Sequence, residues 1–90
     1  MYKIVEPKQY TKKLIRFLKK HRDLISKYEK TIFLLESNPQ HPSLRLHKLQ
    51  GNLKEYYSVS LDMEYRIILD FIIIDAQIIL IDIGSHDDVY

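Results

Sequence analysis

A change in hydrophobic period near residue 40 constrains this 90-residue chain more than any other feature. Before it, apolar residues recur three or four positions apart, as on one face of a helix. Tyr10 and Leu14 follow this spacing, and we expect a helix over residues 8–20. The same period predicts a second helix over residues 23–37, with Asp23 as its N-terminal cap. Because the connection is short, the two helices should form an antiparallel hairpin.

After residue 40 the apolar residues alternate with polar ones, as in strands that bury one face and leave the other open. This pattern predicts strands over residues 54–61, 65–71 and 77–83, joined as an antiparallel meander. A first strand is expected at residues 2–5 and a short extra one at residues 44–49. The fold class is therefore α+β, with the order β-α-α-β-β-β and a helical hairpin packed on a curved antiparallel sheet.

The length fits one domain, and we assign residues 1–90 to it. No apolar run approaches the roughly 20 residues of a membrane span, and no secretory signal is evident. With no cysteine, the chain has no disulfides, which fits a cytoplasmic location. After Gly84 the chain turns polar, and we expect a released polar end.

The net charge of +2 divides unevenly, into +9 for residues 1–54 and −7 for residues 55–90. A polyanion could bind the basic part, although helices often carry solvated lysines with no partner.

Several kinds of chemistry are excluded by missing motifs. The sequence has no glycine-rich phosphate loop, no Gly-x-Ser-x-Gly elbow and no His-Glu-x-x-His helix. It also lacks the spacing of zinc ligands. We therefore expect no metal site and no small-molecule cofactor.

Two histidines and one arginine remain as candidates for chemistry. His86 follows the most apolar strand, and His47 lies beside Lys48 and near Arg45. A histidine can accept or donate a proton near neutral pH. Arg66, in an otherwise apolar strand, either faces the open side, where it could bind phosphate, or pairs with a carboxylate.

Each of the three also has a simpler interpretation. His86 would be an exposed histidine of the tail, His47 a solvent-facing residue of an edge strand, and Arg66 part of an ion pair on the exposed face of the sheet. His21 and His41 are more typical of structural positions. Among seven tyrosines, Tyr56 and Tyr90 are the candidates for stacking on a nucleobase.

Three segments resemble the RelE/ParE toxin superfamily of bacterial type II toxin–antitoxin systems. The closer similarity is to its RelE/StbE and YafQ-like mRNA interferases, over the whole chain. The segments are residues 46–51 (LHKLQG), 65–69 (YRIIL) and 81–90 (IDIGSHDDVY), of which the last is the most specific.

The resemblance implies a toxin that cuts mRNA on the ribosome without a metal, by attack of the 2′-hydroxyl on the adjacent phosphate. By position it implies His47, Glu64, Arg66 and His86 as catalytic residues, with His86 as the proposed acid. We expect RNA-binding roles for five further residues: Arg45, Lys48, Lys54, Tyr56 and Tyr90. Ser58 and Ser60 depart from the pattern, since YafQ-like toxins carry an acid and a second histidine there.

The resemblance also implies three partners: a cognate antitoxin, the ribosome and mRNA. An antitoxin of this kind is an acidic segment that folds on binding, and the basic helices from Lys12 to Lys30 would suit either it or RNA. Two alternatives stay open. One is a ParE-like gyrase inhibitor or a degraded toxin that only binds its antitoxin; the other is a structural domain.

Overall fold

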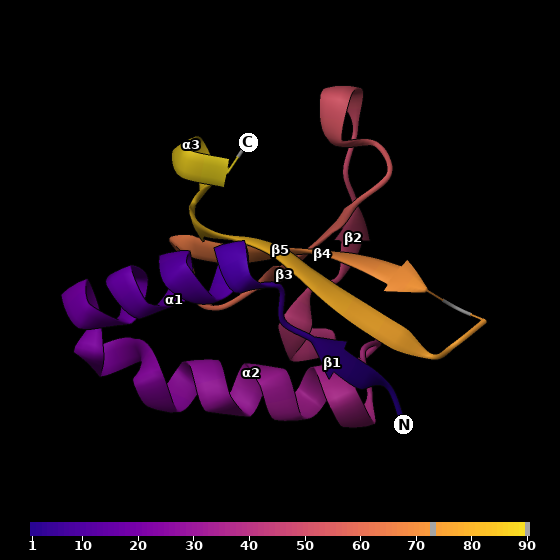
Figure 1. Cartoon of the computed structure of the whole chain (residues 1–90), viewed down its shortest axis with the longest axis horizontal. Helices are drawn as coiled ribbons and strands as arrows, with labels where there is room; N and C mark the ends of the chain where they lie inside the picture. Colours follow the sequence, from indigo (N-terminus) through magenta and orange to yellow (C-terminus); the bar gives the residue numbers. More distant parts are fainter. Residues whose placement is uncertain (73, 90) are drawn as a thin grey trace.

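The computed structural model describes residues 1–72 and 74–89 (Figure 1). A helical hairpin lies on one side of a five-stranded sheet. This arrangement confirms the fold class α+β that the sequence predicted. None of the helices within these residues is long and apolar enough to cross a membrane. The elements are β1 (Lys3–Val5), α1 (Lys8–Lys20), α2 (Ile25–Ser37), β2 (His47–Lys48), β3 (Tyr57–Ser60), β4 (Tyr65–Ile72), β5 (Gln77–Ser85) and α3 (His86–Val89), with 3₁₀ turns at Arg22–Leu24, Pro42–Leu44 and Gly51–Leu53.

The two helices begin differently from each other. α1 begins after Pro7, whose fixed φ suits the residue before a helix. We expected Asp23 to cap α2, and this was wrong: Asp23 lies inside the 3₁₀ turn, and Leu24 precedes α2 without a side-chain cap. The turn continues into the helix, so its own carbonyls and amides replace the cap.

The sheet has the order β1-β5-β4-β3-β2, and its three long strands form the expected antiparallel meander. It is mixed rather than wholly antiparallel, because β1 pairs parallel with β5. The helical hairpin and the strands β2 to β4 all lie between β1 and β5 in the sequence, and this long connection is the crossover that parallel pairing requires. A three-residue strand carries too little pattern to reveal its direction, so the sequence could not show this.

The strand expected over residues 44–49 is reduced to two residues. Pro42–Leu44 forms a 3₁₀ turn, and Arg45 then adopts the left-handed conformation, with φ 50°. Only His47 and Lys48 pair with β3. A non-glycine residue at positive φ is uncommon and turns the chain sharply, which shortens the strand.

The main core lies between the hairpin and the sheet. Leu35 of α2 and Ile67, Leu69 and Leu80 of the sheet are fully buried there. Tyr10 and Tyr28 join the helices through a buried hydrogen bond of 2.9 Å between their hydroxyls.

A second, smaller cluster covers part of the other face. It consists of Leu49, Ile68 and Val89, with Leu53 and Tyr56 packed against them. Val89 belongs to α3, so the released polar end that we expected was wrong. β5 continues through Ser85, and the chain then folds back because Val89 can bury its side chain on Ile68.

Candidate functional site

The register of the sheet places the candidate residues on the face opposite the hairpin. Arg66 lies between Ser60 and Gly84 on the neighbouring strands. Because side chains alternate along a strand and Ile67 points into the main core, Arg66 points to the other face. The sequence left two possibilities for Arg66, and the structure places it on the open side.

Arg66 lines a hollow of about 450 Å³ that also contains Arg45, Glu64, Lys27 and Ser60. The guanidinium is half-buried, and among the residues that the structure describes no carboxylate lies within 4.0 Å of it. A guanidinium without a carboxylate partner retains its donors for a bound anion. The hollow, which Arg45 and Lys27 also line, therefore has room for an anionic group such as a phosphate beside Arg66.

His47 is exposed in the short β2 strand, opposite Ser58. Its Nδ1 lies 3.1 Å from the backbone oxygen of Arg45. Because a carbonyl oxygen only accepts, Nδ1 carries the proton in this contact, which leaves Nε2 of the neutral ring as an acceptor. His47 and Lys48 line a separate hollow of about 380 Å³.

His86 is the first residue of α3, two residues beyond Gly84, and its side chain is 64% exposed. Its Nδ1 is 3.9 Å from Oδ1 of Asp87, close enough for an ion pair when the ring is protonated. Since Gly84 lies directly opposite Arg66, the Cα atoms of His86 and Arg66 are within about 12 Å of each other.

Glu64 lies at the turn between β3 and β4 with its side chain exposed. The carboxylate of Asp62 shapes this turn, because its Oδ1 accepts hydrogen bonds from the backbone N–H groups of Glu64 and Tyr65, each 2.9 Å long. Glu64 thereby reaches the same hollow as Arg66.

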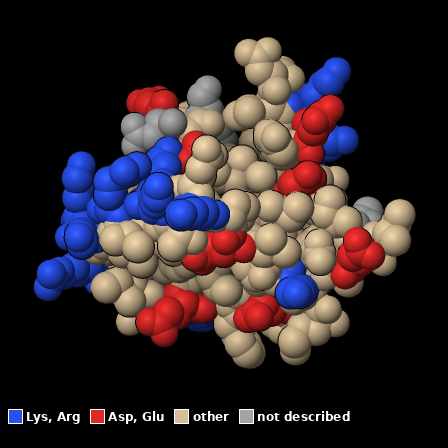
Figure 2. All heavy atoms as spheres, viewed as in Figure 1, with Lys and Arg blue, Asp and Glu red and all other residues tan. Residues whose placement is uncertain are grey.

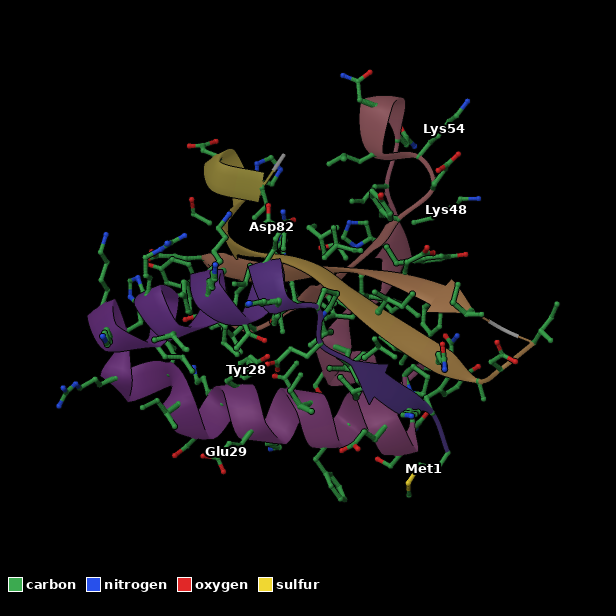
Figure 3. All side chains as sticks on the ribbon, in the orientation of Figure 1. Met1, Tyr28, Glu29, Lys48, Lys54 and Asp82 are labelled. Carbon is green, nitrogen blue, oxygen red and sulfur yellow. The ribbon has the colours of Figure 1, made fainter. Side chains whose placement is uncertain are left out.

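The remaining RNA-binding candidates lie around the loop between β2 and β3. Lys48 and Lys54 project from this region into solvent (Figure 3). Tyr56 is half-buried against the second cluster, which limits its free surface for stacking. Tyr90 lies outside the described residues.

The two serines have different surroundings. Ser58 is fully buried in β3, directly opposite His47 of β2 and Ile68 of β4. Ser60 donates a hydrogen bond of 2.8 Å to the backbone oxygen of Asp62 and so supports the turn. Neither serine presents an acid or base to solvent.

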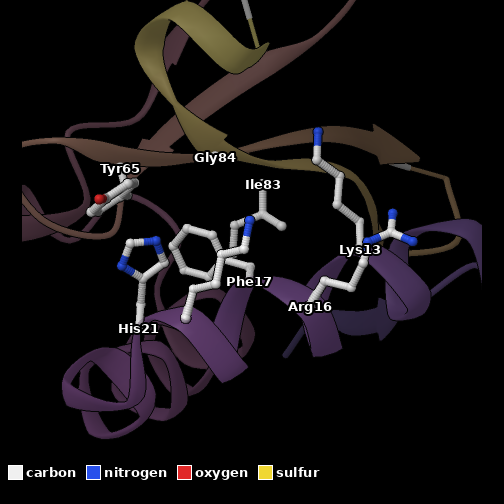
Figure 4. A pocket seen from close by; sticks show the side chains of 8 residues that line it. Lys13, Arg16, Phe17, His21, Tyr65, Ile83 and Gly84 are labelled. Atoms are coloured by element: carbon white, nitrogen blue, oxygen red, sulfur yellow. The ribbon is translucent and has the colours of Figure 1, made fainter.

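A third hollow, of about 260 Å³, lies between α1 and the carboxyl end of β5 (Figure 4). It contains Arg16 and Lys20, which the sequence analysis considered only as part of the basic helices, and His21, which we interpreted as structural. The basic side chains gather over α1 on this side of the molecule (Figure 2). The sequence does contain a signal that could have indicated this cationic cluster: Lys13, Arg16 and Lys20 lie three or four positions apart, which places them on one face of the helix.

Among the side chains that the structure describes, no group of three His, Asp or Glu residues is arranged to hold a metal ion. Figure 3 shows Asp82, the acidic residue of β5; it forms an ion pair with Lys13 of α1.

No protein-family model matches the chain, and no curated protein matches it at a significant level. Solved structures match it over its full length. A metal-bound toxin from Helicobacter pylori is 24% identical with a TM-score of 0.82, and each chain is covered completely. YafQ from Escherichia coli strain BL21(DE3) is 18% identical with a TM-score of 0.80, covering 100% of this chain and 99% of YafQ.

Toxins of this fold have also been crystallised with antitoxins. YafQ in the E. coli DinJ–YafQ toxin–antitoxin complex is 21% identical with a TM-score of 0.78, covering 99% of this chain and 97% of the other. A chain of the Staphylococcus aureus YoeB–YefM complex is 20% identical with a TM-score of 0.73, and the match covers 96% of this chain and 98% of that one. At these identities the similarity establishes the fold.

Proposed function

Because the chain has the fold of the RelE/ParE toxins, we propose that residues 1–90 form the toxin of a type II toxin–antitoxin pair. The toxin acts in the cytoplasm as an endoribonuclease that cuts mRNA on the ribosome. The single observation that carries the nuclease activity is the position of Arg66, which faces the open side of the sheet without a carboxylate partner among the described residues.

In the proposed site, one phosphodiester binds between the open face of the sheet and α3. Arg66 binds the scissile phosphate and stabilises the charge that develops on it, with Arg45 in the same hollow. The span of about 12 Å between the Cα atoms of Arg66 and His86 lets their side chains approach one phosphate from two sides.

The reaction needs a base and an acid. The base takes the proton of the 2′-hydroxyl, O2′ bonds to phosphorus, the bond from phosphorus to O5′ breaks, and the acid protonates O5′. The products are a 2′,3′-cyclic phosphate and a free 5′-hydroxyl. His86 is the proposed acid, and His47 through Nε2 or Glu64 through its carboxylate is the proposed base.

Lys48 and Lys54 attract the RNA backbone in this proposal, and Tyr56 and Tyr90 position bases. The partner that silences the toxin is a cognate antitoxin, since the structurally similar toxins of E. coli and S. aureus were crystallised with DinJ and YefM.

The test is mRNA cleavage in a translating extract, read by primer extension. Arg66→Ala and His86→Ala should each reduce cleavage by roughly 10²–10³-fold, as expected for removal of a charge-stabilising group or a general acid. His47→Ala and Glu64→Gln identify the base, because the larger loss marks it.

Arg22→Ala is the matched control, since Arg22 is exposed in the turn between the helices, away from the open face. It should cleave like the wild type. Unchanged cleavage in both Arg66→Ala and His86→Ala would contradict the mechanism.

A gyrase inhibitor is the second candidate, favoured by the buried Ser58 and the structural Ser60 where a nuclease of the YafQ type has an acid and a histidine. It predicts no cleavage by the folded wild type and inhibition of DNA supercoiling by purified gyrase. A degraded toxin that only binds its antitoxin would do neither.

A further inference from the structure

The hollow between α1 and β5 combines positive charge with aromatic surface (Figure 4). Three cationic side chains of α1 reach it, and three rings and the end of β5 complete its wall. Its lining is Lys13, Arg16, Phe17, Lys20, His21, Tyr65, Ile83 and Gly84.

Two of the three cations are available to a ligand. Lys13 forms an ion pair with Asp82. Arg16 and Lys20 are exposed, and neither has a carboxylate within 4.0 Å among the described residues. Two positive charges four positions apart on one helix face, neither of them in an ion pair among the described residues, attract an anionic group.

The aromatic wall favours a nucleotide over an acidic peptide. The ring of His21 lies 4.6 Å from that of Phe17 and 4.6 Å from that of Tyr65, measured between ring centroids. Nucleobases stack on such rings, whereas an aspartate or glutamate side chain has no ring to place there. Burial, together with the carboxylates of Glu64 and Asp62, raises the pKa of Tyr65. A tyrosine hydroxyl is protonated at neutral pH even at its ordinary pKa of about 10, so Tyr65 can act as a hydrogen-bond donor.

The location connects this hollow with the proposed catalytic face. Gly84 lines the hollow and lies opposite Arg66, and α3 begins two residues later with His86. In Figure 4 the ribbon of α3 lies above the end of β5, and the ribbon of α1 lies below it. A strand of RNA whose scissile phosphate lies beside Arg66 can pass α3 and place a flanking nucleotide between α1 and β5.

We propose that the hollow between α1 and β5 is a subsite for one nucleotide of single-stranded RNA, with Arg16 and Lys20 on its phosphate and the His21–Tyr65 wall against its base. This subsite rests on the proposed nuclease function, because it positions the same RNA strand. It gives the C-terminal half of α1 a specific role instead of a general electrostatic one.

The experiment measures RNA binding without cleavage. A fluorescein-labelled eight-nucleotide 2′-O-methyl RNA cannot be cut, because its attacking hydroxyl is blocked, and its affinity is read by fluorescence anisotropy at low salt. The pocket variant is Arg16→Gln with Lys20→Gln. The matched control is Lys12→Gln with Lys19→Gln, which removes the same charge from exposed positions of α1 that do not line the hollow.

The pocket variant should bind roughly 10-fold more weakly and the control less than about 3-fold, with a shallower salt dependence for the pocket variant. Thermal denaturation checks that both remain folded. Equal losses in the two variants, or no measurable binding by the wild type, would overturn the subsite. Cleavage in the extract is scored separately, so a failure of the subsite is distinguishable from a failure of the nuclease.

Two further probes identify the ligand. An abasic oligomer of the same length should bind the wild type several-fold more weakly than the base-bearing one; equal affinity would refute the base contact. Poly-glutamate of matched charge should compete poorly. If it displaces the RNA as well as unlabelled RNA does, the hollow is a site for an acidic peptide and the nucleotide assignment is wrong.

Discussion

Ile67 and Ile68 are neighbours on β4 and are both almost fully buried, at 0% and 1% exposed, but they lie in different clusters. Ile67 points into the main core beneath the helical hairpin. Ile68 points to the opposite face, where the loop around Leu53 and the short helix α3 cover it. The same strand therefore builds the fold with one face and supports the candidate site with the other.

The two faces differ in how much holds them together. Among the residues that the structure describes, thirteen are buried in the cluster of the hairpin face and three in that of the opposite face. Because a small cluster contributes less burial, the elements that cover the open face should move more easily than the helices. The candidate acid, His86, is carried by one of these weakly held elements.

The largest expected effect comes from truncating the two isoleucines separately. Ile67→Ala should lower the free energy of unfolding by about 4 kcal/mol, and Ile68→Ala by about 2 kcal/mol, because the smaller cluster can collapse around the lost atoms. Urea denaturation measures both. Equal losses would mean that the open face is as tightly packed as the hairpin face.

Val89→Ala tests α3 on the open face. Val89 is buried on Ile68, so losing two methyl groups should cost about 1–2 kcal/mol. If α3 positions His86, the cleavage by Val89→Ala, expressed as a fraction of wild-type cleavage, should fall well below the fraction of the variant that remains folded. Cleavage that simply follows the folded fraction, measured by circular dichroism in the same buffer, would show that α3 is only structural.

The hairpin face contains a buried, hydrogen-bonded pair of tyrosines, Tyr10 and Tyr28, and both of them are titratable. Burial raises the pKa of Tyr28 to about 12, although the hydroxyl of Tyr10 lowers it, and burial also raises the pKa of Tyr10. An unfolded tyrosine ionises near pH 10, so the unfolded chain loses these protons first. Stability should therefore be constant below about pH 9 and fall as the pH rises from about 10 to about 12.

Tyr28→Phe removes one of these groups and a buried hydrogen bond of 2.9 Å. It should cost about 1 kcal/mol at neutral pH and make the alkaline decline shallower. Urea midpoints from pH 8 to pH 11.5 measure this. A decline of unchanged steepness would mean that Tyr28 ionises equally in both states.

The sequence predicted the parts of the fold that rest on long periodic patterns. Both helices and the three-stranded meander follow from apolar spacing, because each buries a continuous face. Features set by contacts distant in sequence were not predictable. The parallel pairing of β1 depends on the crossover, and the packing of α3 depends on Val89 meeting Ile68.

The candidate site was predictable to a similar degree. Residue type and strand alternation left two possibilities for Arg66, the open side or an ion pair, and the register then showed it on the open side with Gly84 beside it. The shortening of β2 by Arg45 was not predictable, because a positive φ at an arginine leaves no signal in the sequence. The role of His21 depends on a ring from β4, so its helical position alone could not reveal it.

The smallest expected effect concerns Ser60, a polar residue of the open face beside Arg66. Its hydroxyl donates to the backbone oxygen of Asp62 at 2.8 Å, so Ser60→Ala should cost about 0.5–1.5 kcal/mol and leave cleavage per folded molecule unchanged. Urea denaturation and the translating extract give the two values. A loss of cleavage of 10-fold or more with little change in stability would place Ser60 in the reaction. The hydroxyl of Ser60 would then be a reactive group of the open face in spite of its hydrogen bond to Asp62.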